Sequence, residues 1–186
     1  MTEQGIIGIL KETGVMLEGH FLLTSGKHSA RYMQCAQLFQ YPKHSRALCE
    51  LLARRFENVD LVIGPAMGGI IMAYEVASLL NARNVFTERQ DGAMVLRRGF
   101  EIQKGERVLI CEDVVTTGGS VKEVVEIARQ AGGDVLGVCS IIDRSGGKAE
   151  FGCRFESVAK LEIETWEESE CPLCKHSKPI KPGSRK

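Results

Sequence analysis

The sequence lacks any apolar run that approaches the roughly 18–20 residues needed to cross a membrane. Residues 1–14 contain acids but no basic segment followed by a small-residue cleavage site, so we expect no signal peptide. Apolar residues make up 44% of the 186 residues and charged residues 26%, which is ordinary for a globular protein. We therefore expect a cytoplasmic chain of one domain, with no membrane partner.

An excess of charge of one sign is also absent. The 24 Lys and Arg residues balance the 24 Asp and Glu residues, so the formal net charge is zero. A general nucleic-acid-binding protein usually shows a basic excess or patch, and we expect no nucleic-acid partner here. A neutral net charge does not exclude a local basic site that binds a small anion.

A disulfide framework and a nucleophilic triad are not indicated either. The chain has seven cysteines, an odd number, and four of them lie in apolar or helix-like stretches: Cys35, Cys49, Cys111 and Cys139. A free thiol behaves there as a small buried hydrophobe, so we expect reduced cysteines. Without a Ser/His/Asp constellation, we interpret His20, His28 and His44 as surface or packing residues.

Strand and helix patterns alternate from about residue 43 to residue 143. Short apolar runs predict strands at 60–64, 84–89, 107–113 and 135–143, and helical periodicity predicts helices at 42–56, 68–80 and 120–133. Asp91 and Gly92 lie between two extended arms, which predicts a hairpin. Such alternation is typical of βαβ units, so we predict an α/β fold with a mostly parallel central sheet flanked by helices.

The segment VLICEDVVTTGGS, residues 108–120, carries most of the chemical information. A strand ends in Glu112 and Asp113 and is followed by a loop of hydroxyl and glycine residues that enters a helix. Backbone N–H groups of such a loop and the helix N-terminus bind one phosphate group. The segment is neither a P-loop nor a dinucleotide fingerprint, because the required Gly-Lys-Ser/Thr and G-x-G-x-x-G are missing. The paired acids suit two sugar hydroxyls, so we expect a ribose 5-phosphate.

This segment resembles the phosphoribosyl-pyrophosphate (PRPP) signature of the type I phosphoribosyltransferases. The resemblance implies that the two acids hold the ribose hydroxyls and that the loop holds the 5-phosphate. It extends over about residues 18–147, and it implies a fold with a small N-terminal hood and a mobile hairpin. The PRPP-binding residues implied in this segment are Glu112, Asp113, Val114, Val115, Thr116, Thr117, Gly118, Gly119 and Ser120.

Three further segments resemble the orotate phosphoribosyltransferases. Residues 60–73 resemble the loop whose backbone faces pyrophosphate, here Pro65, Ala66, Met67, Gly68 and Gly69. Residues 23–34 resemble the hood over the base, and residues 140–147 resemble the strand end whose arginine contacts the orotate carboxylate. The implied orotate-binding residues are Arg144, Thr116, Thr24, Lys27 and Tyr32. The implied reaction transfers 5-phosphoribosyl from PRPP to orotate, giving orotidine 5'-monophosphate and pyrophosphate for UMP synthesis.

The sequence departs from the family where lysines are common. Thr24, Gly68 and Gln90 occupy those positions, so we expect Arg89, assisted by Arg97 or Arg98, to stabilise the leaving pyrophosphate. The alternative is that these arginines are solvated charges on the hairpin. The resemblance also implies Asp113 in catalysis, Mg²⁺ carried by PRPP with Asp113 or no protein ligand, and a homodimer whose mobile loop reaches the neighbouring site.

The sequence also predicts the domain organisation. We predict one phosphoribosyltransferase domain at 1–170, with a hood from about 1–34 and parts of 144–165, followed by an extended Cys/Pro/Lys-rich tail at 171–186. Cys171 and Cys174 have the spacing of a zinc site, with His176 or Cys153 as further candidates, but we expect a reduced pair without metal. The functional alternatives are transfer to a purine base and a PRPP-sensing regulator on the same fold.

Overall fold

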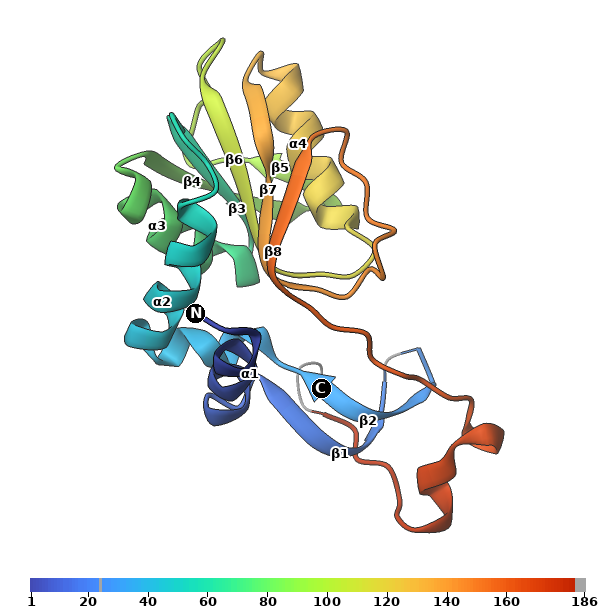
Figure 1. The fold of residues 1–186 in the computed structure, drawn as a ribbon. Coiled ribbons are helices and arrows are strands. Elements are labelled where there is room, and N and C mark those ends of the chain that lie inside the picture. Colours follow the sequence, from blue (N-terminus) through green and yellow to red (C-terminus); the bar gives the residue numbers. More distant parts are fainter. Residues whose placement is uncertain (24, 183–186) are drawn as a thin grey trace. The chain divides into compact units, whose positions relative to one another are not determined.

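The computed structural model of the protein describes residues 1–23 and 25–182, which divide into two compact units. The first, here called the core unit, comprises residues 41–161. The second, here called the terminal unit, combines residues 1–40 with the C-terminal segment that begins at Glu162. Figure 1 shows the elements of each unit.

The core unit is built on a six-stranded sheet in the order β5-β4-β3-β6-β7-β8. Neighbouring strands are parallel except β5, which pairs antiparallel with β4 at one edge. The mostly parallel sheet predicted from the sequence is therefore confirmed, and β8 is a strand that the sequence analysis did not predict. The strands are β3 (Leu61–Pro65), β4 (Arg83–Gln90), β5 (Ala93–Leu96), β6 (Arg107–Val115), β7 (Asp134–Asp143) and β8 (Arg154–Lys160).

Helices cover both faces of this sheet (Figure 1). The helices α2 (Pro42–Ala53) and α3 (Gly68–Leu80) pack together on one face, and α4 (Gly119–Gln130) packs on the other. The alternation of side chains along β3 explains this arrangement. Ile63 belongs to the apolar cluster that includes Val121 and Val124 of α4, whereas the next residue, Gly64, meets the backbone of α3. All five residues of β3 are buried, as expected for a strand covered on both faces.

The βα connections place their loops at the carboxyl ends of β3 and β6. Pro65 ends β3 and α3 begins three residues later; Val115 ends β6 and α4 begins four residues later. Because the strands are parallel and adjacent, both loops lie at the same end of the sheet. Ligands of open α/β sheets bind at this end.

The terminal unit contains α1 (Glu3–Glu12) and an antiparallel hairpin of β1 (Met16–Leu22) and β2 (His28–Met33). The Thr2 side chain caps α1 by accepting a hydrogen bond from the Gly5 N–H, and Gly14, with φ of +71°, follows the helix end. Three short 3₁₀ helices complete the unit: Cys35–Gln40, Glu168–Glu170 and Pro172–Lys175.

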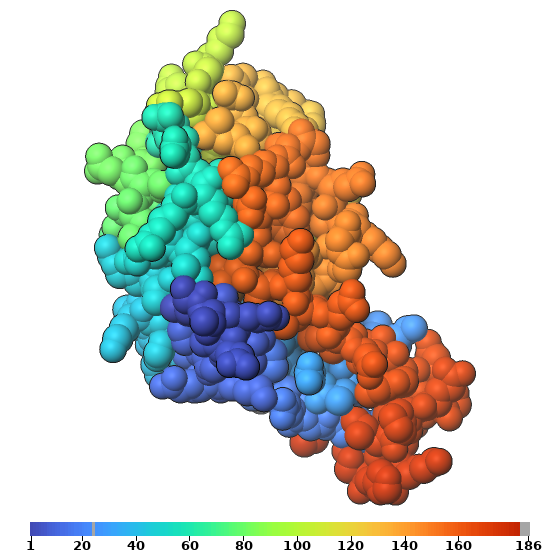
Figure 2. Space-filling model, in the orientation of Figure 1, coloured from blue at the N-terminus to red at the C-terminus, as the bar shows by residue number. Residues whose placement is uncertain are grey.

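The C-terminal segment pairs with the hairpin in two places. Trp166 forms an antiparallel bridge with His28, and Ile180 forms a parallel bridge with Phe21. In Figure 2, residues 162–182 are orange and red and lie against the blue residues of the same unit. Among the helices of the described residues, none is long and apolar enough to cross a membrane.

Candidate functional site

Two adjacent carboxylates mark the carboxyl end of β6. Residues 108–111 of this strand are fully buried, and Glu112 and Asp113 follow where the sheet opens to the loops. Asp113 Oδ1 accepts a hydrogen bond of 2.8 Å from the Val114 N–H, and Glu112 Oε1 accepts one of 3.2 Å from the Asp113 N–H. The backbone therefore fixes both carboxylates at the position where the sequence predicted them.

Burial alters the acidity of this pair. Removal from water, together with the nearby negative charge of Asp113, raises the pKa of Glu112 to about 9. Burial also raises the pKa of Asp113 above its usual value. Since two close buried carboxylates cannot both ionise easily, the pair holds a proton near neutral pH. Such a pair gains stability from a ligand that brings hydroxyl donors or a cation.

The loop after β6 forms a concave site of about 290 Å³. Gly118 adopts a φ of +76°, and a Cβ atom on it would lie 2.8 Å from the Phe151 ring, so only glycine fits this turn. α4 begins at the next residue, which directs its N-terminus at the site. The lining residues are Arg89, Glu112, Val114, Val115, Thr116, Thr117, Gly118, Gly119, Ser120, Val121 and Glu123.

The loop after β3 lies directly against the acids. A Cβ atom on Gly68 would lie 2.6 Å from the carboxylate oxygens of Asp113, and one on Gly69 would lie 2.7 Å from the Cys111 carbonyl oxygen. This close approach requires glycine at position 68, since any side chain would displace Asp113. Pro65, Ala66 and Met67 complete the turn, which includes a cis peptide bond between Ala66 and Met67.

The three candidate arginines do not share one location. Arg89 lies at the rim of the concave site, where it forms a 2.7 Å ion pair with Glu123 and a 3.4 Å hydrogen bond to Ser120 Oγ. Arg97 and Arg98 instead pair with Glu88, at 3.3 Å and 2.9 Å. Because side chains alternate along β4, Glu88 and Arg89 point to opposite faces of the sheet. The structure thus brings only Arg89 to the lining described above.

Arg144 follows β7, the strand next to β6. Its N–H donates a 2.8 Å hydrogen bond to the Val115 carbonyl, so the residue adjoins the start of the glycine loop and Thr116. Lys27 and Tyr32 belong to the terminal unit, where Lys27 pairs with Glu167 at 3.0 Å and the Tyr32 hydroxyl donates to Gln34. Thr24 lies outside the described residues.

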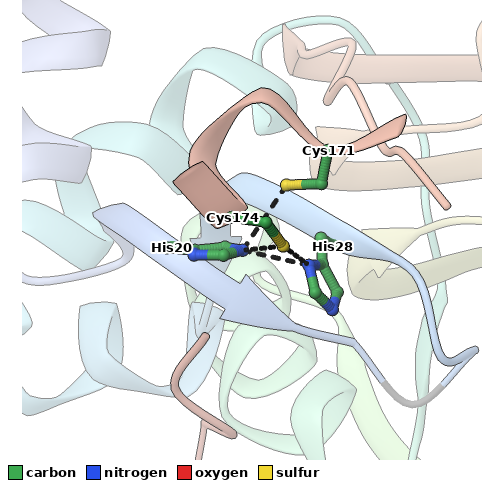
Figure 3. Close-up of side chains that lie close together, drawn as sticks. All are labelled: His20, His28, Cys171 and Cys174. Carbon is green, nitrogen blue, oxygen red and sulfur yellow. Dashed lines mark hydrogen bonds between the residues drawn. The ribbon is translucent and has the colours of Figure 1, made fainter. Parts of the chain in front are cut away.

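Two features of the molecule were missed from the sequence. Glu123 lines the site and also accepts a 2.9 Å hydrogen bond from the Met94 N–H, which ties β5 to α4. The second feature lies in the terminal unit, where His20 and His28 are buried and face Cys171 and Cys174 (Figure 3). Glu123 could have been found from the sequence, because it lies one helical turn after Ser120. His20 and His28 could not, because the sequence does not show that the C-terminal segment folds back onto them.

A mostly parallel α/β sheet that presents paired acids and a glycine-rich cradle beside a second glycine loop defines the type I phosphoribosyltransferase class. The phosphoribosyl transferase domain family matches residues 34–169 of the chain. An orotate phosphoribosyltransferase of Caldanaerobacter subterraneus subsp. tengcongensis is 57% identical over 189 aligned residues, which cover the whole of both chains. The chain therefore belongs to the phosphoribosyltransferase family, among relatives that are orotate phosphoribosyltransferases.

Solved structures agree with this placement. The orotate phosphoribosyltransferase of Aeropyrum pernix superposes with a TM-score of 0.73 at 28% identity, covering 84% of this chain and 93% of that one. An adenine phosphoribosyltransferase of Rhodothermus marinus gives a TM-score of 0.69 at 19% identity, covering 86% of this chain and 100% of that one. The second likeness concerns the fold alone, so it does not favour a purine base.

Proposed function

We propose that the protein transfers the 5-phosphoribosyl group from PRPP to orotate, giving orotidine 5'-monophosphate and pyrophosphate for pyrimidine biosynthesis. The observation that carries the proposal is the contact of Gly68 with the Asp113 carboxylate, beside the glycine-rich cradle. This contact brings the residues that we assign to the ribose hydroxyls, to the 5-phosphate and to pyrophosphate next to one another. The full-length likeness to orotate phosphoribosyltransferases supports orotate as the acceptor.

In this proposal, the two loops divide the binding of PRPP. Glu112 and Asp113 accept hydrogen bonds from the ribose hydroxyls, while N–H and hydroxyl groups of residues 116–120 hold the 5-phosphate. Backbone N–H groups of residues 66–69 face the pyrophosphate, at the N-terminus of α3, where the helix dipole favours negative charge. Binding the two ends of PRPP on fixed backbone orients the C1 atom between them.

Arg89 supplies positive charge at the rim of the site. Pyrophosphate becomes more negative as the bond to C1 lengthens, and a positioned guanidinium stabilises that change. Arg89 is held by Glu123 and by the Gly92 carbonyl at 2.6 Å, so it changes partners when PRPP binds. Arg97 and Arg98 remain candidates for the same role in a closed state of the hairpin.

The donor set at the end of β6 fits Mg²⁺. Carboxylate oxygens are the ligands that this ion prefers, and the raised pKa values of Glu112 and Asp113 fall when a cation approaches. Asp113 would hold the ion, which would supply positive charge to the leaving pyrophosphate. The protein's own contribution is the fixed position of that carboxylate against Gly68.

A homodimer is the assembly we propose. α3 exposes an apolar stripe at helical spacing, where Met67 is 84%, Ile71 52% and Tyr74 66% exposed. The stripe begins in the pyrophosphate loop, so a second copy packed on it would lie beside the site. Analytical ultracentrifugation of the full chain tests this proposal by measuring its mass in solution. We expect the mass of a dimer for the wild type and a mass closer to that of the monomer for Tyr74→Glu.

We also propose the cytoplasm as the compartment. All seven cysteines are free thiols, including Cys111 and Cys139, whose sulfur atoms lie 3.2 Å apart in the core. Free thiols are typical of reducing compartments.

The experiment that tests the proposed reaction is the ultraviolet loss of orotate with purified protein, PRPP and Mg²⁺. We expect consumption that requires all three components, with pyrophosphate released in equal amount. Adenine, hypoxanthine, xanthine and uracil serve as competing acceptors in the same assay. Turnover of one of these bases in place of orotate would overturn the proposal that orotate is the acceptor. Binding of PRPP without turnover of any base would favour a PRPP-sensing regulator.

Replacing Arg144 tests the acceptor side of the site. We expect Arg144→Gln to raise the KM for orotate about tenfold, because a charge-assisted hydrogen bond to the orotate carboxylate is lost. The KM for PRPP should change little. Arg54→Gln is the matched control, since Arg54 lies on the exposed end of α2 and pairs only weakly with Glu50. A change in orotate KM below threefold would place Arg144 outside the orotate contacts.

A further inference from the structure

We propose that the terminal unit contains a structural zinc site formed by His20, His28, Cys171 and Cys174. The four side chains come from β1, β2 and the C-terminal segment, and they converge on one point (Figure 3). Their ligand atoms, one per residue, all lie within 4.8 Å of one another. Two imidazoles and two thiolates are a common donor set for four-coordinate zinc.

The distances between the ligand atoms are close to those of a zinc tetrahedron, with two of them slightly shorter. Zn–N bonds of about 2.0–2.1 Å and Zn–S bonds of about 2.3 Å place neighbouring ligand atoms about 3.3–3.8 Å apart. His20 Nε2 lies 3.5 Å from Cys171 Sγ and 3.8 Å from Cys174 Sγ. His28 Nδ1 lies 3.2 Å from Cys174 Sγ and 3.0 Å from His20 Nε2. Four ligand atoms at these separations leave a central position for one ion.

The hydrogen bonds of His20 prepare it as a ligand. Its Nδ1 lies 2.9 Å from the Ser177 carbonyl oxygen, which can only accept a hydrogen bond. Nδ1 therefore carries the proton, and the lone pair of Nε2 points toward His28 and the two sulfur atoms. A metal-bound histidine commonly donates its other N–H to a backbone carbonyl in this way, which fixes the ring orientation.

The site lies where the terminal unit needs a link. Backbone pairing attaches the C-terminal segment to the hairpin at Trp166 and again at Ile180, and residues 167–179 form the loop between them. Both cysteines are in this loop, and both histidines are in the hairpin. Small folding units often depend on a metal or disulfide because their apolar core is limited. Four protein ligands leave no open position, so the ion is structural rather than catalytic.

The remaining candidate ligands from the sequence do not take part. His176 is exposed and is not one of the four clustered residues, and Cys153 belongs to the core unit. Both residues therefore serve as matched controls. The competing possibility for the C-x-x-C pair is a disulfide between Cys171 and Cys174, which would remove both sulfur ligands.

The test is the zinc content of the full, tag-free chain, purified from medium with added zinc and measured by mass spectrometry of the metal. We expect one zinc per chain in the wild type, in Cys153→Ser and in His176→Asn, and only background zinc in Cys171→Ser and Cys174→Ser. Replacement by cobalt should give the visible bands of a tetrahedral ion and a sulfur-to-cobalt charge-transfer band that weakens in Cys174→Ser.

The wild type decides the proposal even where a variant fails to fold. A wild-type chain without zinc or cobalt uptake would overturn it, and so would a Cys171–Cys174 disulfide found after alkylation and peptide mapping. Unchanged zinc content in folded Cys174→Ser, with circular dichroism as the check on folding, would equally overturn it. Removal of zinc from the wild type by a chelator is expected to lower the melting temperature and expose residues 167–179 to protease.

Discussion

Asp113→Asn is expected to lower kcat/KM for PRPP by about 100-fold. The substitution keeps the size of the side chain but removes the charge that accepts a hydrogen bond from a ribose hydroxyl. A hydrogen bond to a charged group contributes about 1.5–3 kcal/mol, and a loss of about 2.7 kcal/mol, near the upper limit, corresponds to the stated 100-fold. The Asn side chain still fits against Gly68, where the native carboxylate lies. Steady-state kinetics with varied PRPP, at saturating orotate, measure the effect.

The matched control is Asp134→Asn. Asp134 is exposed and begins β7, so it lies at the end of the sheet opposite the candidate site. We expect this control to keep wild-type kinetics and a similar melting temperature. If Asp113→Asn also kept its kcat/KM for PRPP, the assignment of the ribose hydroxyls to the end of β6 would be wrong.

The sheet was predictable because its strands carry a simple signal. The strands β3, β6 and β7 are buried on both faces, so each consists of a short apolar run. In α3 and α4, apolar residues recur with the periodicity of a helix. The helix predicted at 68–80 has the bounds that the structure gives it. β8 was missed because it contains no apolar run: Phe155 lies between charged Arg154 and Glu156 at the sheet edge, and polar Ser157 follows.

The phosphate cradle was predictable because all its residues are contiguous along the chain. The relation between Gly68 and Asp113 was not, since it depends on the packing of α3 against the end of β6. The cluster of His20, His28, Cys171 and Cys174 was hidden for the same reason. About 140 residues separate its two halves, and the C-x-x-C spacing alone does not indicate which histidines fold back to it.

Glu112→Gln is expected to stabilise the protein at alkaline pH while impairing its use of PRPP. The pKa of Glu112 rises from 4.5 to about 9 in the folded chain, chiefly through burial. Between these two pH values the folded chain keeps a proton that the unfolded chain has released. The free energy of unfolding therefore falls as pH rises through this window, by at most about 1.4 kcal/mol per pH unit. Glutamine has no such proton to lose, so the variant escapes this decline.

The melting temperature of Glu112→Gln should exceed that of the wild type by about 5 °C at pH 8, which corresponds to about 2 kcal/mol in the free energy of unfolding. This is less than the pKa shift alone would give, because the site opens to water, which screens the charge of Glu112. The difference should vanish near pH 4.5. Glu126→Gln, on the exposed face of α4, is expected to show neither change. Loss of one hydroxyl contact should lower kcat/KM for PRPP by about tenfold. A difference in melting temperature that is independent of pH would contradict burial as the cause. A stabilised but impaired variant would mean that the chain keeps a buried acid at this strand end for its ligand, at the expense of its own stability.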